Sequence, residues 1–183
     1  MPHIKYPEEV IFDAAFELAK DYGMEKVTSD AVAAKLGCSK QPIYSAFKNM
    51  VDLKNAVLQR ATKKYAEFLF TERPGVTMTI SIALNYVRFA REYPHLFRFI
   101  FFSDRGENVA IVNHRLDENK PKVVEIIKNE HKLTDSQAED HYIKMGIFCN
   151  GIAAMIISKT SDFSDKDILR LINEVRDGIL SVK

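Results

Sequence analysis

Cysteine is scarce and tryptophan is absent in this chain of 183 residues. The two cysteines, Cys38 and Cys149, are too few and too far apart in the sequence to predict a disulfide framework or a cysteine metal site. We therefore expect both thiols to be reduced and buried.

Long hydrophobic runs are also missing. The opening residues, MPHIKYPEEV, lack the apolar stretch of a secretion signal, and the longest apolar run, Met145 to Ile157, contains Asn150 and is too short to span a bilayer. A hydrophobic content of 46% with 28% charged residues is ordinary for a globular protein. We expect a cytoplasmic protein that does not enter a membrane.

The common catalytic arrangements are absent as well. The seven glycines are scattered, so the sequence predicts no phosphate-cradling loop, and it contains no nucleophile elbow. None of the five histidines has a partner at metal-ligand spacing on one helix face. We predict no metal, no cofactor and no enzyme activity; the alternative is an all-helical enzyme that uses His95 with a carboxylate.

What is present is a pair of short helices over residues 28–47, TSDAVAAKLGCSKQPIYSAF. We expect Thr28 to cap the first helix and Gly37 to end it at a positive φ. We expect Ser39 to cap the second helix. Apolar residues at helical spacing predict the inner face, where a small alanine lets the helices cross closely. These residues are Val32, Ala33, Leu36, Ile43 and Phe47.

The second helix of this pair carries hydrogen-bond donors and cations on its other face. They are Lys40, Gln41, Tyr44, Ser45 and Lys48. Such side chains suit base edges and phosphates in a DNA major groove. The alternative is an ordinary helical hairpin with a solvated polar face.

The neighbouring segments are predicted to be helical too. Pro7 and Gly23 bracket a helix whose apolar stripe is formed by Val10, Ile11, Ala14, Ala15, Leu18 and Tyr22. Asn49 and Asp52 form a capping signal for a long helix from Asn49 to about Phe70, with Leu53, Ala56, Val57 and Ala61 facing inward.

Charge is unevenly distributed, although the net charge is only +1. Residues 8–25 contain six acids and one lysine, whereas residues 26–64 contain eight cations and two acids. The positive stretch surrounds the proposed reading helix, and phosphate attraction needs only a local positive face. A solvated helix surface is the plainer interpretation of the same pattern.

Residues 11–58 resemble the amino-terminal domain of the TetR/AcrR family of bacterial transcriptional regulators. The resemblance rests on Ala14-Ala15, Gly23, Thr28, Val32-Ala33, Leu36-Gly37, Ser39, Ile43-Tyr44, Phe47, Asn49 and Leu53 at the family's spacing. It implies that Ser29, Tyr44 and Lys48 hold phosphates, that Lys40, Gln41 and Ser45 lie nearest the bases, and that Pro42 meets a thymine methyl. Met50 and Ala46 depart from the family's pattern.

The remainder is predicted to be helical, after a break at Arg73-Pro74-Gly75. We expect helices at Thr77 to Glu92, Pro94 to Phe102 and Pro121 to Lys132. Thr134 with Gln137 forms a capping box for a helix to about Lys159. Ser164 with Asp167 caps the last helix, with Phe163 and Ile168 in staple positions.

The segment MGIFCNGIAAMII, residues 145–157, is apolar all round, and it therefore needs cover on both sides. Together with the last helix it predicts a homodimer interface formed by Gly151, Ala154, Ile168, Leu171, Ile172, Val175 and Ile179. The resemblance agrees, because TetR-like proteins dimerise through their last two helices. A monomeric core is the alternative.

The aromatic stretch from Tyr86 to Phe102 resembles a segment that lines or gates an inducer pocket in AcrR-like regulators. An apolar effector would be enclosed by Phe89, Phe99, Phe102, Phe148 and Met155, with a few polar contacts from Tyr86, His95, His114, His141 or Asn150. Core packing is the alternative for each of them.

The sequence thus predicts an all-α protein with a three-helix, helix-turn-helix DNA-binding domain at 1–48, a connecting helix at 49–71, and a helical effector-binding and dimerisation domain at 72–183. The expected function is that of a homodimeric repressor, which binds a palindromic operator on double-stranded DNA and leaves it when a small molecule binds. The connecting helix is the expected lever.

Overall fold

The computed structural model describes residues 6–102 and 110–182, without the side chains of residues 110–118. All regular elements in these ranges are helices, as predicted. They form two compact units, and the division falls within the long fourth helix, after Lys64. The first unit comprises residues 6–64 and 95–102, and the second comprises residues 65–94 and 110–182. Nothing among the described helices has the length and apolarity needed to cross a membrane.

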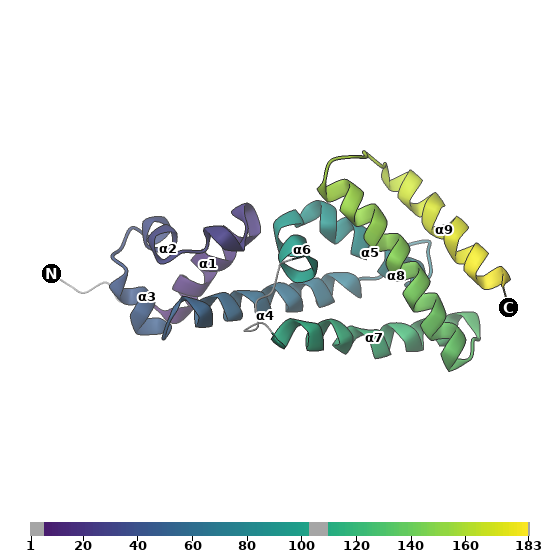
Figure 1. Cartoon of the computed structure of the whole chain (residues 1–183), viewed down its shortest axis with the longest axis horizontal. Coiled ribbons are helices and arrows are strands. Elements are labelled where there is room, and N and C mark those ends of the chain that lie inside the picture. Colours follow the sequence, from purple (N-terminus) through teal and green to yellow (C-terminus); the bar gives the residue numbers. More distant parts are fainter. Residues whose placement is uncertain (1–5, 103–109, 183) are drawn as a thin grey trace. The chain divides into compact units, whose positions relative to one another are not determined.

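The first unit is built around α1 (Glu8–Tyr22), which packs against η1 (Met24–Lys26), α2 (Ser29–Leu36) and α3 (Gln41–Ala46) (Figure 1). It also contains the first part of α4 (Met50–Leu69) and nearly all of α6 (Pro94–Phe101). Pro7 and Gly23 bracket α1 as predicted, and the amide of Asp52 donates to Asn49 Oδ1 at 2.9 Å at the start of α4. The 3₁₀ turn η1 was not predicted.

The buried face of α1 differs from the predicted stripe. Ile11, Ala14 and Ala15 are buried as expected, but Val10 and Tyr22 are 41% and 59% exposed. Phe16 and Ala19 are buried as well. The buried face of α1 thus includes Phe16 and Ala19 and excludes Val10 and Tyr22, and α1 packs against η1, α2 and α3.

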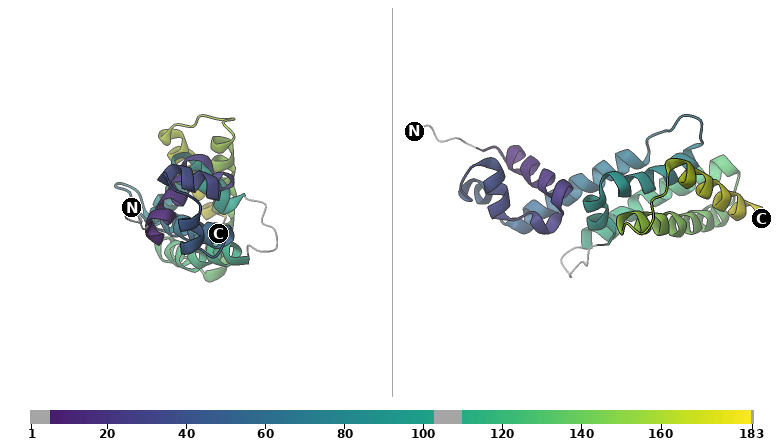
Figure 2. Two further views of the ribbon diagram at one scale, coloured as in Figure 1. Left: turned by 90° about the vertical axis from the view of Figure 1, so that its left-hand side faces the viewer. Right: turned by 90° about the horizontal axis from the view of Figure 1, so that it is seen from above.

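The second unit contains the end of α4, α5 (Met78–Glu92), α7 (Ala110–His131), α8 (Asp135–Ile157) and α9 (Asp165–Ser181). Helix α8 packs against α5, α7 and α9, and α9 runs back along α8 (Figure 2). Both predicted capping boxes are present, Thr134 with Gln137 and Ser164 with Asp167. Ile80, Val87, Ile152, Ile168 and Ile172 lie at the centre of this unit's core.

Helix α7 begins much earlier than predicted, because Pro121 lies inside it and not at its start. A proline inside a helix removes one backbone hydrogen bond and usually ends the helix. Here Val123 and Ile127 are buried, and tertiary packing of this kind stabilises a helix more than local propensity does.

Candidate nucleic-acid interface

The turn between α2 and α3 has the geometry that the sequence predicts at both ends of α2. The amide of Ala31 donates to Thr28 Oγ1 at 3.2 Å, which caps the helix. Gly37 adopts φ 65°, and the amide of Cys38 donates to the carbonyl of Ala33 at 3.0 Å. A left-handed residue closes the helix in this way and lets α3 begin four residues later.

Two expectations about this turn are wrong. Ser39 does not cap α3; the N-cap residue is Lys40, whose side chain makes no capping bond. The carbonyl of Lys40 instead accepts the amides of Ile43 and Tyr44, so the helical conformation begins one residue later than expected. Cys38 is half-buried rather than buried, whereas Cys149 is buried.

One face of α3 is buried and the opposite face is exposed. Ile43 and Phe47 are 1% and 8% exposed, and Val32 and Ala33 of α2 are buried too; Leu36 is only half-buried. The predicted reading residues Lys40, Gln41, Tyr44, Ser45 and Lys48 are all exposed, while Ser29 and Pro42 are half-buried. Helix α3 and its flanking residues are therefore anchored in the unit through Ile43 and Phe47, and their polar side chains face solvent.

Hydrogen bonds on this face restrict two of the side chains. Ser45 Oγ donates to the carbonyl of Gln41 at 2.9 Å, so this hydroxyl is used internally as a donor and its oxygen can still accept. Lys40 Nζ lies 2.7 Å from Asp30 Oδ1 on α2. The hydrogen bond and the charge of Asp30 raise the pKa of Lys40 above its usual value, so the ammonium stays charged.

The positive charge around α3 is smaller than a count along the sequence suggests. Lys40 is paired with Asp30, and Arg60 pairs with Asp13 of α1. The guanidinium of Arg60 also lies 4.8 Å from the centroid of the Phe16 ring, which gives it a packing role. In contrast, no carboxylate of residues 6–102 lies within ion-pair distance of Lys48.

In the second unit, some of the residues predicted to line an effector pocket lie together. The hydroxyl of Tyr86 donates to Asn150 Oδ1 at 3.1 Å, and Phe148 packs against the same core cluster as Tyr86. Burial raises the pKa of the Tyr86 hydroxyl above its usual range, so the group remains a neutral hydrogen-bond donor.

The other predicted pocket residues are placed differently. Phe89 is fully buried, with its ring centroid 5.2 Å from that of Tyr65, which fits core packing. Met155 is 40% exposed. Phe99, which is half-buried, and Phe102, which is 48% exposed, belong to the first unit. The side chain of His114 lies outside the described residues.

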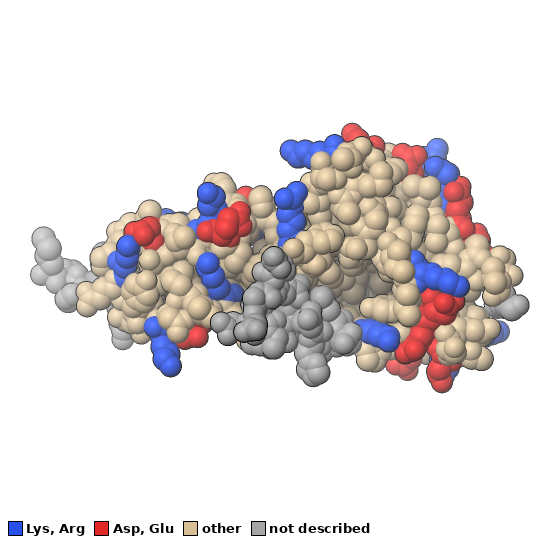
Figure 3. All heavy atoms as spheres, viewed as in Figure 1, with Lys and Arg blue, Asp and Glu red and all other residues tan. Residues whose placement is uncertain are grey.

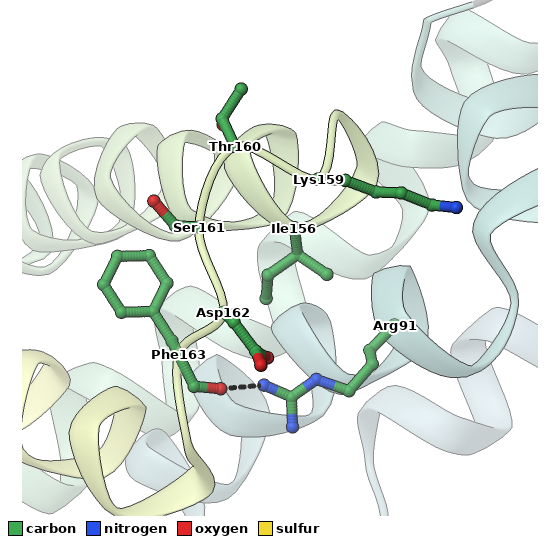
Figure 4. A pocket seen from close by; sticks show the side chains of 7 residues that line it. All are labelled: Arg91, Ile156, Lys159, Thr160, Ser161, Asp162 and Phe163. Carbon is green, nitrogen blue, oxygen red and sulfur yellow. Dashed lines mark hydrogen bonds between the residues drawn. The ribbon is translucent and has the colours of Figure 1, made fainter.

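A groove of about 380 Å³ lies at the connection between α8 and α9 (Figure 4). None of the predicted pocket residues lines it; its lining is formed by Arg91, Ile156, Lys159, Thr160, Ser161, Asp162 and Phe163. Arg91 donates to Asp165 Oδ1 and to the carbonyl of Phe163, each at 2.5 Å. These bonds attach the start of α9 to α5.

Part of the predicted dimer interface lies inside the chain. Ile168 and Ile172 are 1% and 0% exposed in the core of the second unit, so they present no surface to a partner. Val175 and Ile179 are half-buried against the same core, and Leu171 is half-buried. Gly151 and Ala154 are exposed. Ile143 and Ile147 on α8, which the predicted interface did not include, are 51% and 70% exposed.

Polar groups also lie inside the second unit, and one of them, His141, was predicted as a polar contact for an effector. His141 is fully buried, and Glu130 Oε2 accepts the amide of Thr79 at 3.0 Å at the start of α5. No group of three or more His, Cys, Asp or Glu side chains among the described residues is arranged to hold a metal ion.

Comparison with known proteins supports the interpretation of the first unit. Residues 11–57 match the model of the family described as bacterial regulatory proteins, tetR family. A curated relative, the uncharacterized HTH-type transcriptional regulator YobS of Bacillus subtilis (strain 168), is 25% identical over 118 residues. This alignment covers 63% of the present chain and 62% of YobS, which is less than two thirds of the relative's length.

Solved structures share the fold over nearly the whole chain. A protein from Pseudomonas aeruginosa PAO1 matches with a TM-score of 0.70 and 13% identity, over 95% of this chain and 90% of its own. A TetR-like transcriptional regulator from Rhodococcus sp. RHA1 matches with a TM-score of 0.59 and 17% identity, over 96% of both chains. Together, these findings show that residues 11–57, from α1 into α4, are similar to the helix-turn-helix domain of the tetR family of bacterial regulatory proteins, and that the chain shares the fold of a TetR-like transcriptional regulator.

Proposed function

We propose that the chain is a cytoplasmic, homodimeric transcriptional repressor that binds a palindromic operator and is released from it by a small-molecule effector. The observation that carries this proposal is the orientation of α3. Ile43 and Phe47 are buried, while the polar side chains from Lys40 to Lys48 are exposed. A rigid helix with such a face can enter a major groove.

The roles of the individual residues follow from their chemistry and exposure. Lys48 is an exposed cation with no ion-pair carboxylate among residues 6–102, and it suits a phosphate, as do the hydroxyls of Ser29 and Tyr44. Lys40, Gln41 and Ser45 would face base edges, and Pro42 would contact a thymine methyl. These assignments are part of the proposal.

The homodimer would form through α8, with a second copy of the chain covering its exposed side. Ile143, Ile147, Gly151 and Ala154 follow one another at helical spacing, and all are exposed. The second half of α8, residues 145–157, contains no charged residue, and the surface over it is tan (Figure 3). Lys144, which pairs with Asp140 at 2.6 Å, borders Ile143 and Ile147. A two-fold dimer presents the same patch from both subunits, and it would provide the two copies of α3 that a palindrome requires.

Effector release would act through the second unit. The hydrogen bond between Tyr86 and Asn150 lies beside apolar core residues, an environment that suits a largely apolar molecule with one or two polar groups. Such a molecule releases DNA if it binds more tightly to the conformation in which the two copies of α3 no longer fit the operator.

Selection of random DNA duplexes on the purified full chain tests this function. We expect an enriched palindrome whose half-site centres lie about 10 base pairs apart. Gln41→Ala should weaken binding to it, whereas Gln59→Ala, at an exposed glutamine of α4, should leave binding unchanged. Failure to enrich any sequence would overturn the proposed function.

Effector release needs its own test. A library of apolar small molecules can be screened for compounds that free the selected duplex from the protein. We expect the action of a true effector to weaken in Tyr86→Phe, which removes the hydroxyl that bonds Asn150. The matched control is Tyr22→Phe, at an exposed tyrosine of α1. Equal responses of both variants would contradict the assigned site.

A further inference from the structure

The ion pair between Asp30 and Lys40 lies on the proposed DNA-reading surface. Lys40 Nζ is 2.7 Å from Asp30 Oδ1, and both side chains remain open to solvent, Lys40 being 50% and Asp30 77% exposed. The two residues come from different helices, Asp30 from the first turn of α2 and Lys40 from the residue that precedes α3. The pair therefore has a defined place in the helix-turn-helix and is still accessible to a ligand.

The pair has little net charge to offer a phosphate. The carboxylate of Asp30 offsets the ammonium of Lys40, and it would itself repel the DNA backbone. Its contribution to the free energy of folding is also small, because exposed ion pairs contribute about 0–1 kcal/mol. A carboxylate in the first turn of α2 stabilises that helix by about 0.3–1 kcal/mol, but this effect does not require a pair with Lys40.

Counting hydrogen-bonding groups indicates a more specific role. A lysine ammonium has three donors, and one of them points to Asp30, which leaves two. The carboxylate of Asp30 keeps its second oxygen as an acceptor, with no other hydrogen-bond partner among the described residues. The pair thus presents two donors and one acceptor side by side.

This pattern is complementary to the major-groove edge of one kind of base pair. Guanine offers two acceptors there, N7 and O6, and its partner cytosine offers one donor, the N4 amino group. An A·T pair offers an acceptor, a donor and an acceptor, followed by a methyl group, so it matches less well.

We propose that Asp30 and Lys40 together read one G·C base pair in each operator half-site, with Lys40 donating to guanine and Asp30 accepting from cytosine. Asp30 is then a specificity-determining residue, in addition to the side chains of α3. This inference rests on the proposed function, because it needs α3 to lie in a major groove.

The test compares the base preferences of five full-length proteins, the wild type and four variants, on the duplex that the wild type selects. We expect a G·C pair at symmetry-related positions of the two half-sites, preferred over A·T by about 5-fold to 100-fold. Asp30→Asn and Lys40→Met should each flatten that preference, because each removes one of the two contacts to the base pair, and the double variant should abolish it. Lys48→Ala is the matched control, and it should weaken all duplexes while keeping the preference.

A chemically altered duplex isolates the contact further. Replacing the guanine by 7-deazaguanine removes the N7 acceptor and keeps the base pair, so wild-type binding should weaken and Lys40→Met binding should not.

Two outcomes would overturn the inference while leaving the proposed function intact. In the first, Asp30→Asn strengthens binding to every duplex equally, which would show that Asp30 acts only by repelling phosphates. In the second, Asp30→Asn keeps the full preference for G·C, which would show that Asp30 does not contact the base pair. Absence of any selected sequence for the wild type would overturn both proposals.

Discussion

The imidazole rings of His131 and His141 stack inside the second unit, with their centroids 5.5 Å apart and an angle of 21° between the ring planes. His141 is completely buried, and neither of its ring nitrogens has a hydrogen-bond partner among the described residues. Burial is the main reason that the pKa of His141 is lowered to about 4; His131 and Arg176 lower it further, and Glu130 and Asp140 oppose them. The folded protein therefore holds this ring neutral.

The buried ring predicts acid sensitivity. The unfolded chain binds a proton near pH 6.5 and the folded chain only near pH 4. The free energy of unfolding should therefore be highest above pH 6.5 and fall as the pH drops toward 4, by up to about 1.4 kcal/mol per pH unit from this group. Urea unfolding of the wild type and of His141→Phe at pH 7, 6 and 5 measures the effect.

We expect His141→Phe to have the shallower pH dependence, because phenylalanine keeps an aromatic ring beside His131 but cannot bind a proton. The control is His95→Phe, which makes the same substitution at a half-buried histidine of the first unit. An equal slope for His141→Phe and the wild type would show that this ring does not govern the acid response.

The sequence predicted local features well and tertiary environments less well. The caps at Thr28, Thr134 and Ser164 were predictable because each bond joins residues three apart in the chain. The exposure of Ile147 was not predictable, since its apolar face could equally have been covered by the chain itself. Asp30 appeared only as an opposing charge, because its meeting with Lys40 depends on how α2 and α3 cross.

Lys48 provides a test of the proposed phosphate contact. Replacing it with alanine should weaken binding to every duplex and lower the steepness of the salt dependence by about one unit for each subunit, because each lost phosphate contact releases one counterion fewer. Fluorescence anisotropy titrations at salt concentrations from about 50 to about 200 mM measure this slope, because DNA affinity changes strongly over that range. Gln41→Ala should change which sequence is preferred and keep the slope. If Lys48→Ala has the same salt dependence of binding as the wild type, Lys48 does not contact a phosphate.

Gly37 provides a test of the turn between α2 and α3. Its φ of 65° is costly for most residues, and a Cβ there would meet no atom within 4 Å, so only backbone strain opposes a side chain. Gly37→Ala should lower the free energy of unfolding by about 1 kcal/mol. Gly37→Asn should lose less, because asparagine tolerates the left-handed conformation. Calorimetry measures the free energy of unfolding of both variants. Equal losses of stability in the two variants would indicate that the turn changes shape when the glycine is replaced.

Ile147 provides a test of the dimer. Its side chain is 70% exposed on α8, so a lysine there can remain solvated in an isolated chain but would be buried without a partner charge in a dimer. Ile147→Lys should therefore produce a folded monomer in light scattering and lower operator affinity sharply, since one copy of α3 reads only half a palindrome.

The control for this dimer test is Val51→Lys, which changes an apolar residue of α4 that is 56% exposed. It should leave the dimer intact.

A second comparison distinguishes the interface from the core. Ile172→Asp places a charge where the native side chain is 0% exposed. This variant should unfold the second unit instead of yielding a folded monomer. If Ile147→Lys has the same dimer mass as the wild type in solution, α8 is not the dimer interface. A monomeric wild type would overturn the homodimer itself.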